Sequence, residues 1–71
     1  MFVKPESITM QLGGVRDAIS QREATQVLRR LKGVRSAAVD DRAVATVTFR
    51  ADQTTVDTIT GALSEAGFPV I

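Results

Sequence analysis

The stretch VRSAAVDDRAVATVTF, residues 34–49, decides the fold because it predicts two β-strands joined by a tight turn. In its first half, residues 34–40, a period of two places Ala37 and Val39 on one face of a strand. In its second half, residues 43–49, the same period gives one face three apolar side chains: Ala45, Val47 and Phe49. The polar residues DDR between the halves favour a turn, so the whole stretch predicts a hairpin.

The residues before the hairpin predict a strand followed by an amphipathic helix. In residues 7–12 the sequence SITMQL alternates polar and apolar side chains, which is typical of a strand with one polar face and directs Met10 into the core. The helix is marked by apolar residues spaced three, one and three apart: Ala24, Val27, Leu28 and Leu31. Gly33 ends this helix, because glycine adopts the left-handed conformation at little cost.

The residues after the hairpin predict a second helix and a short terminal strand. The apolar stripe of this helix has four members: Val56, Ile59, Leu63 and Ala66. Thr54 is expected to open the helix and Gly67 to end it, while Gly61 in its middle costs about 1 kcal/mol relative to alanine. Residues 68–71 predict a strand, and Pro69 places it at a sheet edge, where a missing N–H does least harm.

The predicted order βαββαβ indicates an α+β fold of the ferredoxin-like type. In that arrangement two helices lie on one face of a four-stranded antiparallel sheet. A chain of 71 residues fills only one core, so residues 1–71 are expected to form a single domain, with residues 1–6 as a loose N-terminal tail.

The composition indicates a folded domain and excludes several kinds of site. Hydrophobic residues make up 44% of the chain and charged residues 24%, which is typical of globular proteins. The chain contains neither cysteine nor histidine, which excludes disulfide bonds and thiolate metal sites. It also lacks tyrosine and asparagine and shows no base beside a nucleophile, so we do not expect an enzyme. No apolar run approaches the roughly 18 residues of a membrane span, so we expect a cytoplasmic location without membrane insertion.

Several segments match the sequence pattern of a known family. They are the strand SITMQL followed by Gly14, the helix end VLRRLKGV, the strand ATVTF and the ending ALSEAGFPVI. On these residues the chain resembles the heavy-metal-associated (HMA) domains: copper chaperones, mercury-binding proteins and the N-terminal modules of metal-transporting P-type ATPases. The resemblance covers residues 7–71. It implies a setting in metal transport or homeostasis, and a protein partner or neighbouring domain such as that of a metal transporter, whose cytosolic part this chain would form.

The metal-binding loop of the HMA family is altered in this chain. The family carries Gly-Met-Thr-Cys-x-x-Cys, and ungapped matching puts Asp17 and Ser20 at the two cysteine positions. Soft Cu(I) is held by thiolates, whereas a carboxylate and a hydroxyl are hard, weak substitutes that suit Mg²⁺ or Ca²⁺ better. We therefore expect no high-affinity metal site and no cofactor. A weak ion site in the loop from Gly13 to Ser20, or an anion site beside Arg16, is the alternative.

Capping of the first helix offers another role for the same residues. Ser20 and Glu23 have the S-x-x-E form of a capping box, in which each side chain accepts a hydrogen bond from the backbone N–H of the other residue. In an alternative register Asp17 is the N-cap. Either arrangement satisfies unpaired N–H groups in the first turn of the helix.

Basic residues gather in one part of the sequence. Residues 16–35 contain six basic and two acidic residues, whereas residues 36–71 contain two basic and five acidic ones. Four of the basic residues form a predicted docking surface for a protein partner: Arg16, Arg22, Arg29 and Arg30. Nucleic acid is not an expected ligand, because RNA-recognition domains stack bases on aromatic residues of their central strands, and here the central strands carry only Phe49, which faces inward.

Together these observations predict an HMA-like domain that lacks the thiol ligands. We expect it to act, as a monomer, as a protein-interaction or regulatory module without high-affinity binding of soft metals. Two alternatives stay open. One is weak metal-ion binding through the loop from Gly13 to Ser20 in metal transport or homeostasis. The other is a small-molecule-sensing regulatory domain, because amino-acid-sensing domains share the βαββαβ order and a loop similar to GGVRD.

Overall fold

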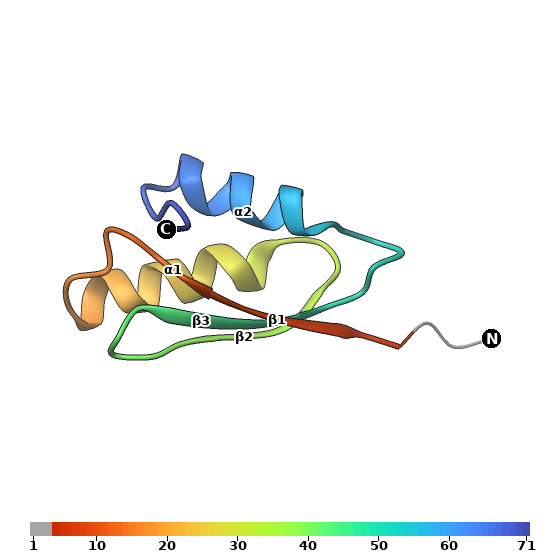
Figure 1. The fold of residues 1–71 in the computed structure, drawn as a ribbon, viewed down its shortest axis with the longest axis horizontal. Helices are drawn as coiled ribbons and strands as arrows, with labels where there is room; N and C mark the ends of the chain where they lie inside the picture. Colours follow the sequence, from red (N-terminus) through yellow and green to blue (C-terminus); the bar gives the residue numbers. More distant parts are fainter. Residues whose placement is uncertain (1–3) are drawn as a thin grey trace.

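The protein forms two layers, with both helices on the same face of one antiparallel sheet (Figure 1). The computed structural model describes residues 4–71. The elements in chain order are β1 (Glu6–Gln11), α1 (Ala18–Arg30), β2 (Val34–Val39), β3 (Val44–Phe49) and α2 (Val56–Glu65). This βαββα order agrees with the ferredoxin-like arrangement that the sequence predicts. None of the helices in residues 4–71 has the length and apolar character that crossing a bilayer requires.

The sheet has the strand order β1-β3-β2, so the hairpin partner β3 lies in the middle. Both neighbours of β3 are antiparallel to it, and in β1 the inward residues Ile8 and Met10 lie opposite Val47 and Ala45. The pairing of β2 with β3 shifts by one residue between Val34 and Ser36. The polar face of the sheet carries a hydrogen bond of 3.0 Å between the hydroxyls of Ser7 and Thr48. The predicted hairpin of β2 and β3 is therefore confirmed, and β1 pairs with the other edge of β3.

A fourth strand is not formed in the described part of the chain, so the prediction of a four-stranded sheet is wrong on this point. The segment after α2 makes a single bridge with the end of β1, between Leu12 and Val70. Two hydrogen bonds flank the bridge, from Gly13 N to Pro69 O at 2.7 Å and from Ile71 N to Gln11 O at 2.9 Å. Because Pro69 has no N–H, it cannot return the bond that it accepts from Gly13, and the ladder stays at one bridge.

The core lies between the sheet and the helices. It contains inward residues of the three strands and two helices and three residues from the segments that flank them. The members are Met10, Leu12, Ala24, Leu28, Ala37, Val39, Ala43, Ala45, Val47, Phe49, Ile59, Leu63 and Phe68. The predicted stripe of α1 is confirmed, because Val27 and Leu31 also pack against this cluster. The predicted stripe of α2 is half right, since Val56 is 42% exposed and Ala66 is also exposed. Val56 is the first residue of α2, and Ala66 is its C-cap.

The start of α2 and the start of β1 each differ from the prediction by one residue. The N-cap of α2 is Thr55, in extended conformation, and not Thr54. Thr54 is instead buried, and its backbone N–H closes a turn by donating to Arg50 O. Glu6, assigned by the sequence to a loose tail, is the first residue of β1 and lies opposite Phe49. Residues 1–3 of that predicted tail lie outside the described residues.

The turn of the hairpin is built around Asp40. Its Oδ1 accepts hydrogen bonds from the backbone N–H groups of Arg42 and Val44, both at 2.9 Å. Ala43 completes the turn in the left-handed region, with φ of 64°. This arrangement resembles a type I turn followed by a left-handed residue, a common three-residue hairpin connection. The turn also supports β1, because Leu12 N donates to Ala43 O at 2.9 Å.

Candidate functional site

The candidate site is the loop between β1 and α1, which corresponds to the metal-binding loop of the resembling family. The loop is held to the C-terminal segment through Gly13 N, which donates to Pro69 O. Gly14 adopts φ of 80°, and a Cβ built on it would collide with the backbone oxygen of Gly67. Only glycine fits there, because an L side chain is strained at this φ and has no room. In Figure 1 the C-terminal segment accordingly lies beside the loop.

Asp17 and Ser20 lie together at the start of α1 and form a reciprocal capping box. Ser20 N donates to Asp17 Oδ1 at 2.8 Å, and Asp17 N donates to Ser20 Oγ at 3.1 Å. Ser20 Oγ also accepts from Arg16 N at 2.8 Å and donates to Asp17 Oδ1 at 2.9 Å. The two side chains therefore satisfy three backbone N–H groups before and within the first turn.

The predicted pairing of Ser20 with Glu23 is wrong, and the alternative register with Asp17 as N-cap is confirmed. Asp17 is extended, with φ of −157° and ψ of −178°, and the helix begins at Ala18. Ser20 is consequently the third helical residue and not the cap. Glu23 lies a turn further on and is exposed, too far along the helix to reach an unpaired N–H.

Hydrogen bonding lowers the pKa of Asp17 from its ordinary value. The largest cause is the bond from the Ser20 backbone N–H, followed by the bond from the Ser20 hydroxyl, while the charge of Arg16 adds a small contribution. The carboxylate is thus held in its charged form by neighbours on its own loop. Within residues 4–71 no three His, Cys, Asp or Glu side chains come together as a metal-binding group. One carboxylate and one hydroxyl are too few oxygen ligands for Mg²⁺ or Ca²⁺ without other donors.

The four arginines of the predicted docking surface are all exposed: Arg16, Arg22, Arg29 and Arg30. Arg16 precedes α1, and the other three belong to it. Arg22 and Arg29 are seven residues apart and so share a face of the helix, about 10 Å apart along its axis. The salt bridge found among the described residues joins Arg50 to Asp52, elsewhere on the molecule. The structure therefore leaves the positive charge of α1 facing solvent.

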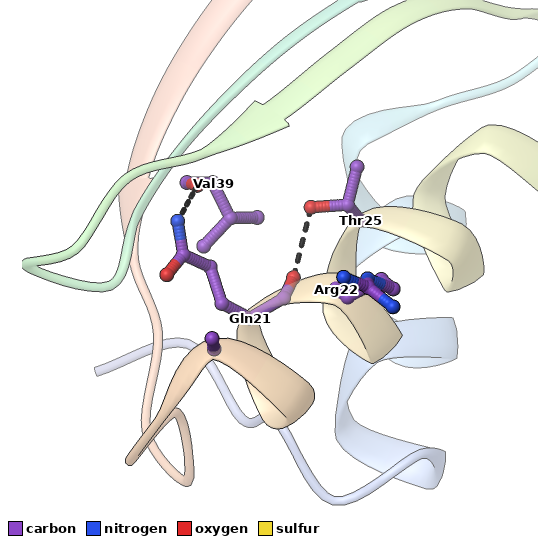
Figure 2. Close-up of a pocket in the computed structure, with 5 residues that line it drawn as sticks. Gln21, Arg22, Thr25 and Val39 are labelled. Carbon is purple, nitrogen blue, oxygen red and sulfur yellow. Dashed lines mark hydrogen bonds between the residues drawn. The ribbon is translucent and has the colours of Figure 1, made fainter.

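A residue that the sequence does not single out, Gln21, joins α1 to β2. Its Nε2 donates to the backbone oxygen of Val39 at 2.7 Å, as Figure 2 shows. Thr25 Oγ1 donates to Gln21 O at 2.9 Å, one turn back on the helix. Around this bond lies an open pocket of about 270 Å³ lined by Ala18, Gln21, Arg22, Thr25 and Val39. The one sequence signal for it was a polar residue at a helix position next to the buried stripe.

The comparisons with known proteins identify the class of fold. The sequence matches no family model and no curated relative. Among solved structures, however, the fold is that of the heavy-metal-associated domains, as the sequence predicts.

Three structures illustrate the likeness, each below 25% identity, so the likeness concerns the fold. Oxidized MerP from Ralstonia metallidurans superposes with a TM-score of 0.88 at 24% identity, over 94% of each chain. The putative copper-ion-binding protein from Bacillus anthracis reaches 0.90 at 20% identity, over 99% of this chain and 100% of that one. The Cu(I)-loaded N-terminal domain of a potential copper-translocating P-type ATPase from Bacillus subtilis reaches 0.86 at 19% identity, over 93% and 84%.

Proposed function

We propose that this chain is a protein-interaction or regulatory domain in metal transport or homeostasis that does not bind soft metals with high affinity. The observation that supports it is the mutual hydrogen bonding of Asp17 and Ser20. These residues stand at the cysteine positions of the resembling family, and their polar atoms serve the start of α1. A chain without cysteine offers Cu(I) no thiolate. We accordingly infer a binding domain and not an enzyme.

The proposed docking surface consists of Arg16, Arg22, Arg29 and Arg30, called the basic face below. These side chains are exposed on α1 and just before it, while the second half of the sequence is acidic. Charges at the rim of an interface set the rate and the orientation of encounter more than the final affinity. The proposed partner is therefore a protein domain with an acidic surface, such as a cytoplasmic domain of a metal transporter.

Metal titration tests the first half of the proposal. The protein is titrated with Cu(I), Zn²⁺, Cd²⁺ and Mg²⁺ while the amide NMR shifts of residues 13–20 are followed. We expect these shifts to stay unmoved in the natural sequence. The matched control is the double variant Asp17→Cys and Ser20→Cys, which restores Cys-x-x-Cys and should gain Cu(I)-dependent shifts in the loop. Saturable, micromolar binding localised to the loop of the natural sequence contradicts the proposal.

Association kinetics test the second half. The probe is the soluble domain of a metal-transporting ATPase from the same organism, and the variant carries Arg→Gln at the four positions of the basic face. We expect the association rate to fall about tenfold or more at low salt, and the difference to shrink at high salt. Arg42→Gln, in the hairpin turn, is the single-charge control and should change the rate far less. Equal rates for the natural protein and the fourfold variant contradict the docking surface.

A further inference from the structure

The pocket beside α1 has a buried floor and an exposed rim. Val39, the last residue of β2, is buried and forms the floor, while Gln21 and Thr25 form half-buried walls (Figure 2). Ala18 and Arg22 are exposed and form the rim. Four of the five lining residues belong to α1, and only the floor comes from the sheet. A group that enters the pocket therefore lies against the helix and needs no backbone bond to β2.

Hydrogen bonds fix the two walls of the pocket. Gln21 Nε2 donates to Val39 O at 2.7 Å, and Thr25 Oγ1 donates to Gln21 O at 2.9 Å. A side-chain amide carries two N–H groups, and the described residues accept only one of the two from Gln21. The walls are thus held in place without a ligand, so binding has little side-chain ordering to overcome.

The residues that line the pocket carry one positive charge and no negative one. Arg22 supplies the charge, and the salt bridge found within residues 4–71 joins other residues. Two carboxylates, Asp17 and Asp40, adjoin the lining in sequence. Both accept hydrogen bonds from backbone N–H groups of their own turns, which partly compensate their charge. The pocket accordingly favours an anionic group paired with Arg22.

The size and the lining of the pocket favour a single side chain as the occupant. Its volume of about 270 Å³ lies below the roughly 300–1,000 Å³ of ordinary small-molecule sites. The apolar atoms of Ala18, Thr25 and Val39 can cover methylene groups, and the guanidinium of Arg22 can pair with a carboxylate. Glutamate combines both features, because two methylenes separate its carboxylate from its backbone, whereas aspartate has only one.

We propose that this pocket receives a glutamate side chain of an acidic partner protein and so provides a specific anchor beside the basic face. This inference rests on the proposed function, because it names the partner side chain that the docking surface recognises. The carboxylate pairs with Arg22 and accepts the second N–H of Gln21, while the methylenes lie on Val39. Charges at the rim of an interface set the association rate, whereas an anchor that fills a pocket slows dissociation. Kinetics therefore separate the two parts of the surface.

The probe is glutamate blocked at both ends, N-acetyl-glutamate N-methylamide, added to the ¹⁵N-labelled protein. We expect a dissociation constant on the order of millimolar, as befits so small a ligand. The amide shifts should be largest at Gln21, Thr25 and Val39, and the side-chain NH₂ of Gln21 should shift with them. The blocked glutamine derivative, the charge control, should bind about tenfold more weakly, and the blocked aspartate derivative, the length control, about threefold more weakly.

Two variants at exposed positions close the pocket or remove its charge. Ala18→Leu fills the pocket from the rim, and Arg22→Gln removes the partner of the carboxylate. Each should weaken binding of the probe about tenfold or more. Arg35→Gln is the matched control, because it removes one exposed positive charge from β2 outside the pocket, and it should change binding less than about twofold. Unchanged amide spectra away from the pocket show that the variants are folded.

Dissociation kinetics separate this inference from the proposed function. With the soluble ATPase domain as partner, Ala18→Leu should raise the dissociation rate about tenfold. If the fourfold arginine variant slows association but Ala18→Leu leaves dissociation unchanged, the basic face stands and the glutamate pocket is wrong. If the blocked glutamate binds in the pocket but the ATPase domain does not bind, the pocket stands and the transporter is the wrong partner. Equal binding of the glutamine derivative, or tighter binding of free glutamate than of the blocked form, overturns the assignment to a partner's side chain.

Discussion

The two helices of this protein begin in the same way, although only one follows the loop that carries metal ligands in the resembling family. At α1, Asp17 is the N-cap, and it bonds Ser20 three residues on through the backbone N–H and the hydroxyl. At α2, Thr55 is the N-cap, and it bonds the backbone N–H of Thr58 at 3.2 Å and its hydroxyl at 3.0 Å. Capping of the helix start therefore explains the contacts of Asp17 and Ser20 without a bound ligand.

What differs between the two helix starts is how the preceding chain is held. Before α1, Gly14 is pressed against the backbone of Gly67, so the loop is fixed by contact with the far end of the chain. Before α2, Thr54 is buried, and its Oγ1 finds no hydrogen-bond partner among the described residues. The first loop is thus held by close backbone packing, and the second carries an unsatisfied polar atom. Substitutions at these positions test the comparison.

The largest effect is expected for Gly14→Ala. The left-handed conformation costs alanine about 1–2 kcal/mol, and the added Cβ would clash with the backbone oxygen of Gly67. We expect the free energy of unfolding to fall by at least about 2 kcal/mol, which lowers Tm by about 8 °C or more for a domain of this size. Thermal and urea unfolding measure it.

Gly67→Ala is the matched control for this prediction. Gly67 also has positive φ, at 93°, but a Cβ there meets nothing within 4 Å. It should therefore lose only the backbone contribution, about 1 kcal/mol. Equal losses at the two glycines would show that close packing does not hold the first loop.

The next effect is expected at the start of α2, where Thr54→Val should stabilise the protein by about 1 kcal/mol. A buried hydroxyl without a partner carries a desolvation cost of about 1–3 kcal/mol, and valine keeps the shape while removing that cost. The adjacent Thr55→Val provides the contrast, because it removes the cap and should destabilise. Denaturant unfolding measures the change in the free energy of unfolding, which should be positive for Thr54→Val and negative for Thr55→Val. If Thr54→Val destabilises the protein, the hydroxyl of Thr54 has a hydrogen-bond partner.

The capping comparison itself predicts similar losses from Ser20→Ala and Thr55→Ala. Each removes a hydroxyl that serves the first turn of its helix, and such caps contribute typically about 1 kcal/mol. The measurement is the free energy of unfolding from urea titration, with Ser64→Ala on the exposed end of α2 as the neutral control. If Ser20→Ala leaves the free energy of unfolding unchanged, the two helix starts are not equivalent, and the Ser20 hydroxyl has a role other than capping.

The sequence predicted the parts of the fold that depend on periodicity. The hairpin of residues 34–49, the stripe of α1 and the burial of Met10 and Phe49 follow from the spacing of apolar residues and the polar turn between the strands, and the structure shows all of them. The prediction of a fourth strand was wrong, although the sequence placed Pro69 at a sheet edge. How many backbone hydrogen bonds an edge segment with a proline can form depends on its register against the neighbouring strand. Register is a property of the assembled sheet.

The start of α1 shows why the candidate site was harder to predict than the fold. Two cap patterns, D-x-x-S at residues 17–20 and S-x-x-E at residues 20–23, overlap in the sequence, and local propensity does not choose between them. The close approach of Gly14 to Gly67 in the loop before this cap joins residues distant in the chain. The bond of Gln21 to Val39 is likewise tertiary, so no local pattern announces it.

The smallest predicted effect distinguishes the two caps by charge. Hydrogen bonds from Ser20 lower the pKa of the Asp17 carboxyl, so this group stabilises the fold above its unfolded pKa, and the contribution is lost as pH falls through the lower folded value. Asp17→Asn keeps a capping oxygen and removes the charge. We expect its deficit in unfolding free energy to be full at neutral pH and to shrink as pH falls from the ordinary aspartate pKa of about 4 through the lower pKa of the folded carboxyl. Because the hydroxyl of Thr55 does not titrate, the deficit of Thr55→Ala should stay constant over the same range. A deficit of Asp17→Asn that is equally constant would mean that Asp17, like Thr55, acts through geometry alone.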